Sequence, residues 1–153
     1  MLVCRVKKVV KLMVVAALTG IIVVAIWVYC FSSSLCLPME GAQASRTYFV
    51  NSPTAFACEK QTLAVWNLPF VEGEKTIYAF ADEAEAKEGV RTILSYYCAE
   101  NIWTEEVGET CSYYATSKKL SRQVHVSGRA INLHIAVRGA QVVVGTPVIF
   151  GCY

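Results

Sequence analysis

Residues 82–97 read DEAEAKEGVRTILSYY, which is the clearest helical pattern in the chain. Asp82 is a favourable N-cap residue, and Glu85 three positions later completes a pattern like a capping box. The apolar side chains that follow recur at spacings of four and three, so they share one helix face: Ala86, Val90, Ile93, Leu94 and Tyr97. We therefore predict an amphipathic helix that ends near Asn101.

The opposite face of this helix is polar and carries Lys87, Glu88 and Arg91. Gly89 weakens the helix by up to ~1 kcal/mol relative to alanine, and we expect it to permit close packing on a sheet. The acidic first turns are typical of a helix N-terminus, where the helix dipole stabilises negative charge. These features indicate a helix with one solvated face and one face in the core.

Strand-like sequence follows the helix, in runs at 111–115, 122–127, 131–138 and 141–150. The run 131–138 alternates, so one set of side chains is expected to point inward: Ile131, Leu133, Ile135 and Val137. The other set is expected to point outward, and His125 of the preceding run is expected to point to the same side. These outward residues form a candidate binding face: His125, Asn132, His134 and Arg138.

Two further strands are expected before the helix, at 61–70 and 75–80, with a turn at 71–74. Residues 32–60 show no sustained period and are interpreted as a tether, which leaves 61–153 as the exported domain. A meander of strands with one helix indicates an α+β fold, in which the helix packs on one face of an antiparallel sheet.

The N-terminal part contains twenty uncharged residues, Leu12 to Phe31, after a basic tail at 1–11. Twenty residues at 1.5 Å rise span roughly 30 Å, about one bilayer core. All four nearby cations precede this run, which predicts a single-pass anchor with the C-terminal domain outside the cell membrane. The alternative is a signal peptide cleaved near Ala44, after which the protein would be secreted.

Charge and cysteine content limit the function classes. Without the four N-terminal cations, ten Lys and Arg face twelve Asp and Glu, so wholesale nucleic-acid binding is not expected. No paired-cysteine or Cys/His motif with zinc spacing occurs. The exported cysteines are either small buried residues or include one disulfide, for which Cys98 and Cys111 are the best candidates.

The segment Asn132-Leu-His-Ile-Ala-Val-Arg138, followed by Val144-Gly-Thr-Pro-Val-Ile149 and a C-terminal tyrosine, resembles a known family. It is similar to the YwmB-type exported proteins of spore-forming Gram-positive bacteria, over roughly residues 75–153. The resemblance implies a TATA-box-binding-protein-like fold, usually built of two halves, of which this chain would have one half-saddle. The first half is shortened to residues 45–70, and Cys152 stands where the family has an acidic residue. The family has no established activity, and the resemblance implies no DNA binding.

Catalytic, phosphate-binding and calcium-binding motifs are absent from the sequence, so no catalytic residue, cofactor or metal ion is predicted. We expect a membrane-anchored binding or scaffolding domain of the bacterial cell envelope rather than an enzyme. The alternative is an envelope enzyme that acts on wall polymer through scattered carboxylates. The cluster Lys118, Lys119 and Arg122 is interpreted as a solvated turn, or else as a contact to anionic wall polymer or lipid headgroups.

Two kinds of protein partner are also expected, an envelope protein or a second copy. Val142 to Val144 in the last strand would leave an unprotected sheet edge in a half-saddle. Such an edge predicts a symmetric homodimer that rebuilds the saddle. The alternative is a monomer in which residues 45–70 fold back as an edge strand.

Overall fold

A computed structural model of the protein describes residues 2–32, 42–52, 55–62, 64, 67 and 70–150. The chain divides into two compact units, residues 1–34 and 35–153. The first unit is helix α1 (Leu2–Ser32), whose side chains are described from residue 9 to residue 25. Within the part of the chain that the structure describes, no helix is both long and apolar enough to cross a membrane.

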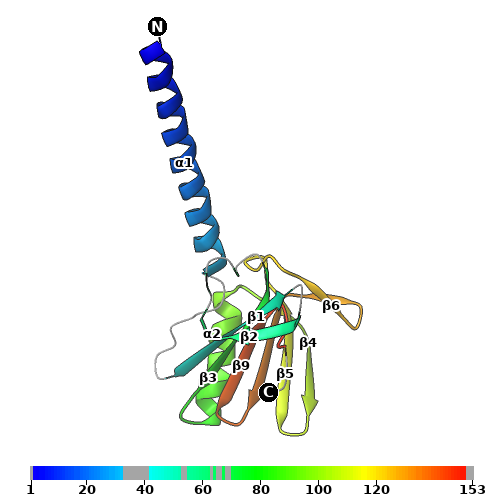
Figure 1. Cartoon of the computed structure of the whole chain (residues 1–153). Helices are drawn as coiled ribbons and strands as arrows, with labels where there is room; N and C mark the ends of the chain where they lie inside the picture. Colours follow the sequence, from blue (N-terminus) through cyan, green and yellow to red (C-terminus); the bar gives the residue numbers. More distant parts are fainter. Residues whose placement is uncertain are drawn as a thin grey trace. The chain divides into compact units, whose positions relative to one another are not determined.

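The second unit is an α+β domain, as predicted (Figure 1). Its described strands form a seven-stranded antiparallel sheet with the order β2-β1-β3-β9-β8-β5-β4, and a separate hairpin pairs β6 with β7. The single helix of this unit among the described residues is α2 (Glu83–Tyr96). The strands are β1 (Gln43–Ser52), β2 (Ala55–Lys60), β3 (Val71–Ala79), β4 (Glu100–Val107), β5 (Thr110–Thr116), β6 (Val124–Val126), β7 (Arg129–Ile131), β8 (Leu133–Arg138) and β9 (Gln141–Thr146).

Helix α2 begins as predicted and ends earlier. The Asp82 Oδ1 atom accepts a hydrogen bond from the Glu85 N–H at 2.8 Å, which is the expected N-cap. The helix stops at Tyr96 instead of near Asn101. Cys98 adopts a φ of 47°, and this left-handed residue turns the chain so that β4 begins at Glu100. The early end explains why β4 was not predicted.

The apolar face of α2 packs on the sheet as predicted. Ala86, Val90, Ile93 and Tyr97 are buried against β8 and β9, while Leu94 is only half-buried. Gly89 allows a close approach, because a Cβ atom there would lie 2.4 Å from the Phe80 ring. Gly89 thus contacts the residue that follows β3, and an alanine at position 89 would displace the Phe80 ring.

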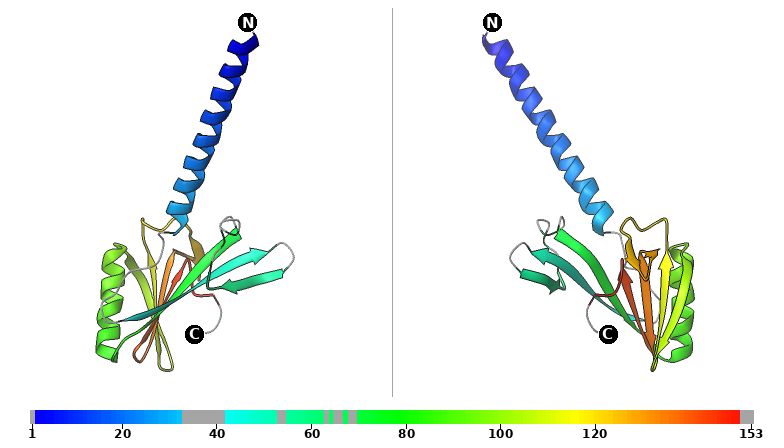
Figure 2. Two further views of the ribbon diagram at one scale, coloured as in Figure 1. Left: turned by 60° about the vertical axis from the view of Figure 1, so that its left-hand side comes forward. Right: turned by 90° about the vertical axis from the view of Figure 1, so that its right-hand side faces the viewer.

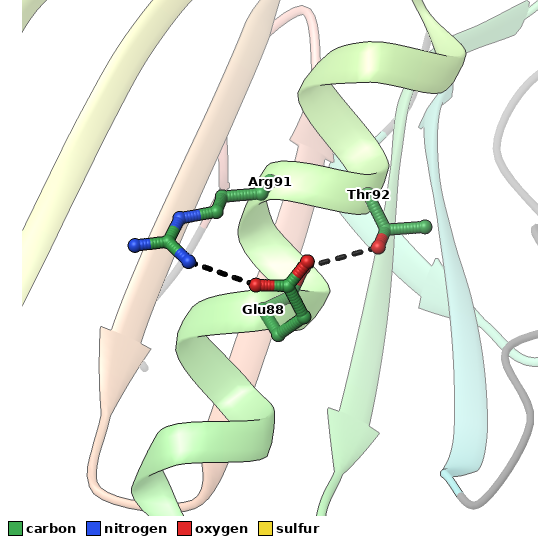
Figure 3. A network of polar contacts seen from close by, with 3 residues as sticks. All are labelled: Glu88, Arg91 and Thr92. Carbon is green, nitrogen blue, oxygen red and sulfur yellow. Dashed lines mark hydrogen bonds and ion pairs between the residues drawn. The ribbon is translucent and has the colours of Figure 1, made fainter.

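The outer face of α2 carries local interactions among Glu88, Arg91 and Thr92, as Figure 3 shows. The Arg91 guanidinium lies 2.9 Å from the Glu88 carboxylate, and the Thr92 hydroxyl donates to the Glu88 carbonyl. Exposed pairs of this kind contribute little to stability, typically ~0.2–1 kcal/mol. The charged face is therefore solvated, as the sequence indicated.

The segment before the helix differs from the prediction. Residues 43–52 and 55–60 are strands β1 and β2 and not part of a tether, and β3 begins at Val71, where a turn was expected. Half of the strand predicted at 61–70 falls outside the described residues, and residues 61 and 62 lie in a bend. The sequence did not predict strands in this segment because β1 carries polar residues on both of its faces. Its sequence therefore lacks the alternation of polar and apolar residues that indicates a strand.

The sheet face opposite α2 is covered in part by the chain end that follows β9 (Figure 2). Phe150 lies against Phe49 with a ring separation of 5.2 Å, and Ile149 packs on Ala136 and Val143. Gly145 makes this return possible, because a Cβ atom there would lie 2.6 Å from the Ile149 nitrogen. We call residues 147–150 the C-terminal strap.

The position of β9 contradicts the assumption on which the homodimer was predicted. This strand pairs with β3 on one side and β8 on the other, so Val142 to Val144 form no edge. The alternative expectation, in which residues 45–70 fold back as an edge strand, agrees with β1 and β2 at one end of the sheet. The homodimer remains a prediction without its structural premise.

The α2 packing predicts unequal effects of three alanine substitutions. Ile93→Ala should lower the free energy of unfolding by about 2–5 kcal/mol, because it leaves a cavity between helix and sheet. Leu94→Ala should cost less, and the exposed control Arg91→Ala should stay within about ±0.5 kcal/mol. Urea unfolding of residues 35–153 measures all three. An Ile93→Ala protein as stable as Arg91→Ala would show that α2 does not anchor the core.

Candidate functional site: the β4 edge and its aromatic stack

The predicted binding face on β8 is not a surface. Asn132 and His134 are 0% and 3% exposed, so the outward half of the predicted alternation is buried as well. The inward half is correct, since Ile131, Leu133, Ile135 and Val137 are all buried. Both faces of β8 are covered, one by α2 and the other by the C-terminal strap and neighbouring side chains.

Asn132 is a structural residue that organises the connection between β5 and β8. Its Oδ1 accepts from the Ser117 N–H at 2.7 Å, and its Nδ2 donates to the carbonyls of Ser117 and Leu120. Its own carbonyl accepts from the Thr146 hydroxyl at 2.7 Å. The amide therefore supplies buried backbone groups with partners, which is a common use of a buried polar side chain.

His134 is also part of the interior. Its ring stacks on Tyr114 with a centroid separation of 4.4 Å, and its Nδ1 accepts from the Ile149 N–H at 3.3 Å. Burial lowers the pKa of His134 to about 4, because the charged imidazolium is poorly solvated there. The neutral ring therefore holds the C-terminal strap at neutral pH.

The remaining residues of the predicted face are exposed but do not meet at one site. His125 lies in the separate β6–β7 hairpin, and Arg138 lies at the end of β8, 3.5 Å from Glu109. In the predicted basic cluster, Lys119 donates to the Tyr96 carbonyl and Arg122 to the Val71 carbonyl. Both cations thus attach the loop after β5 to the domain.

An aromatic stack that the sequence did not reveal runs across the sheet face opposite α2. Its members are Arg129, Trp103, Tyr114 and His134. The Trp103 and Tyr114 rings are 4.2 Å apart and nearly parallel, and the Arg129 guanidinium lies 5.3 Å from the Trp103 centroid. Such a distance permits a cation–π interaction. The stack connects β4 through β5 to the buried centre of the sheet.

Strand β4 is one end of the sheet (Figure 1). Within the described residues it pairs with β5 alone, and most of its residues are exposed. We call residues 100–107 the β4 edge. It carries Glu100, Glu105 and Glu106 and no Lys or Arg, and Val107 is 68% exposed. The Tyr114 hydroxyl donates to the Glu105 carboxylate at 3.3 Å.

A small cavity of about 240 Å³ lies between the first turns of α2 and the β4–β5 hairpin. Glu83, Lys87, Glu106 and Cys111 line it. The Lys87 ammonium donates a hydrogen bond to the Glu83 carboxylate, which raises the pKa of Lys87, and a hydrogen bond with Cys111 raises the pKa of the Tyr113 phenol. Among the described residues, no three His, Cys, Asp or Glu side chains are grouped so that they would hold a metal ion.

The candidate disulfide between Cys98 and Cys111 does not form in this structure, where both are free thiols. Cys98 follows the C-terminal end of α2, whereas Cys111 lines the cavity beside Glu83 in the first turn. The fourteen residues of α2 span about 21 Å, far beyond the Cα separation that a disulfide allows.

Comparison of the chain with protein families, curated proteins and solved structures finds no match. The geometry of the domain itself is therefore the basis for its candidate site. It points to the β4 edge with the adjoining aromatic stack, where exposed charge, an exposed apolar side chain and a strand end occur together.

The Asn132 hydrogen bonds predict that alanine substitutions at Asn132 and Arg138, two residues of the candidate binding face, affect stability very differently. Asn132→Ala should lower the free energy of unfolding by about 3 kcal/mol, because buried backbone groups lose their partners. Arg138→Ala should stay within about ±0.5 kcal/mol, since its side chain is exposed. Urea unfolding measures both. An Asn132→Ala protein with full stability would return Asn132 to the list of binding candidates.

His134 predicts a pH dependence of stability. Its pKa is about 4 when folded, against 6.5 ordinarily, so between these values only the unfolded chain binds the proton. Stability should therefore fall as the pH drops from 6.5 to 4, by on the order of 3 kcal/mol in total. Urea unfolding near pH 7 and near pH 4.5 should show a larger loss for the natural protein than for His134→Gln. Equal losses would contradict the neutral buried ring.

Proposed function

We propose that the protein is a membrane-anchored, extracytoplasmic binding domain of the bacterial cell envelope, which holds a partner protein at the β4 edge. The domain would follow a single N-terminal span and would adopt a half-saddle of the TATA-box-binding-protein type. The resemblance to YwmB-type proteins supports the exported location and this fold type.

The exposure of apolar side chains along α1 supports the proposed membrane anchor. Its large hydrophobic side chains from Val9 to Val24 are each between 51% and 72% exposed. Long apolar faces of this kind require a cover, and lipid provides one along a whole helix. The uncharged run from residue 12 to residue 31 lies within α1, and the Thr19 hydroxyl is satisfied by the Val15 carbonyl. The one-sided placement of the cations supports an outward-facing domain.

The observation that favours binding at the β4 edge is the combination of acidic charge with an exposed strand end. Glu105, Glu106 and Glu109 follow one another around the β4–β5 hairpin, and Val107 lies among them. This charge disfavours an anionic wall polymer as the partner at this edge, and two cations of the basic cluster, Lys119 and Arg122, bind backbone carbonyls instead. A protein partner with basic character fits these charges.

The proposal predicts the outcome of site-specific photo-cross-linking in intact cells. A chain with a photo-reactive residue at position 107 and a C-terminal tag should form a cross-linked species outside the membrane. The matched control places the same residue at Arg91, which is also exposed but lies on α2 and not on the β4 edge. The cross-link should form from position 107 only, because the partner is expected at the edge.

Protease added to protoplasts of the same cells tests the location. It should remove the C-terminal tag and leave an N-terminal tag intact, since only the domain would face outward. Survival of the C-terminal tag until the cells are lysed would contradict the proposed orientation. Equal cross-linking from positions 107 and 91 would contradict binding at the edge.

A further inference from the structure

We propose that the β4 edge binds its partner by strand addition, and that the added strand carries two adjacent basic residues. This inference rests on the proposed binding function and names the chemistry of the partner. The partner would be an extended peptide segment whose backbone pairs with β4 and whose cations lie beside Glu105 and Glu106. Strand addition of this kind obtains affinity from backbone hydrogen bonds and specificity from side chains.

The second half of β4 is the part available for pairing. The register with β5 shifts between Asn101 and Trp103, so the first half of the strand contains a bulge. Trp103 is also covered by the Arg129 guanidinium from the β6–β7 hairpin. Bulges and covering side chains are two ways in which proteins block a sheet edge. Residues 104–107 follow the bulge, keep a regular register with β5 and are exposed.

The charges of this half determine what pairs with it. Glu105 and Glu106 are consecutive and so lie on opposite faces of the sheet. Glu105 pairs with Ser112 and receives a hydrogen bond from the Tyr114 hydroxyl, whereas Glu106 pairs with Cys111 and lines the cavity beside α2. A strand added outside β4 would place two consecutive residues opposite these carboxylates. Basic residues at both positions are complementary, and an apolar neighbour would meet Val107.

A second copy of the chain is disfavoured at the same place. Antiparallel pairing of two copies through residues 104–107 would place Glu105 of each copy opposite Glu106 of the other. Like charges directly opposite each other destabilise a strand pair. The carboxylates therefore act against self-association through this half while they attract a basic strand, so the occupant differs from this chain.

The test uses the full chain in lipid nanodiscs and a labelled peptide of sequence TVKKVT, whose symmetry presents the same residues in parallel and antiparallel pairing. Fluorescence anisotropy should show binding that weakens with salt, because the charge pairs are exposed. The peptide TVEEVT should bind at least tenfold more weakly. A TVKKVT peptide with N-methylated backbone amides should also lose binding, since it keeps the charges and cannot form the ladder.

Variants of the chain locate the site. Glu106→Lys should weaken TVKKVT binding about tenfold, and the double variant Glu105→Lys, Glu106→Lys should prefer TVEEVT. The matched control Glu88→Lys makes the same charge change on the outer face of α2 and should bind like the natural chain. Hydrogen exchange should slow at residues 104–107 when the peptide is bound.

Three results would overturn the inference: no measurable binding of TVKKVT, equal binding of the N-methylated peptide, or an equal loss in Glu88→Lys and Glu106→Lys. These results leave the proposed function testable on its own. A cross-link from position 107 that persists while the peptides fail would mean that a partner docks there without strand addition. Failure of both experiments would remove the binding function of the edge as well.

Discussion

Burial on both faces of the central strands β8 and β9 is the constraint on which this domain depends. Most antiparallel sheets expose one face, but here α2 covers one side and the C-terminal strap returns over the other. Every polar group on these strands must then find a partner inside the protein. Asn132 and His134 meet that requirement, the first through the loop after β5 and the second through the strap. These two polar side chains therefore stabilise the fold and are not available to a ligand.

The sequence predicted α2 and the inward half of β8 because both patterns depend on local geometry. The N-cap, the helix face and the alternation at Ile131–Val137 are set by residues a few positions apart. The prediction that the other half of β8 is exposed was wrong, because residues after β9 pack on it. Sequence periodicity does not indicate a contact between such distant segments. One signal was present: Ala136 stands among the outward positions of β8, where a solvated strand usually has a polar residue.

The strands that were missed have physical reasons of their own. In β1, Arg46 lies on the face toward α2 and its guanidinium is 4.0 Å from the buried Glu74 carboxylate, so charge appears where an apolar residue was expected. In β4, the preceding helix ends at a non-glycine residue in the left-handed region, which leaves no glycine signal for the boundary. The sequence alone does not predict the aromatic stack, because cross-strand neighbours depend on the register of β4 with β5.

The exposed β4 edge and the proposed anchor together suggest how this domain would bind a partner. A four-residue strand addition with two exposed charge pairs has modest affinity by itself, since each such pair contributes only ~0.2–1 kcal/mol. If the partner were confined to the same membrane surface as the proposed anchor, the effective concentration of both would rise and a weak contact would be sufficient. The interior supports this use, because the aromatic stack connects Trp103 of β4 through Tyr114 to the buried His134. An edge that is packed on the core in this way would need less ordering when it binds a partner. The double-sided core is thus the reason why a short, polar edge would present a defined surface to the proposed partner.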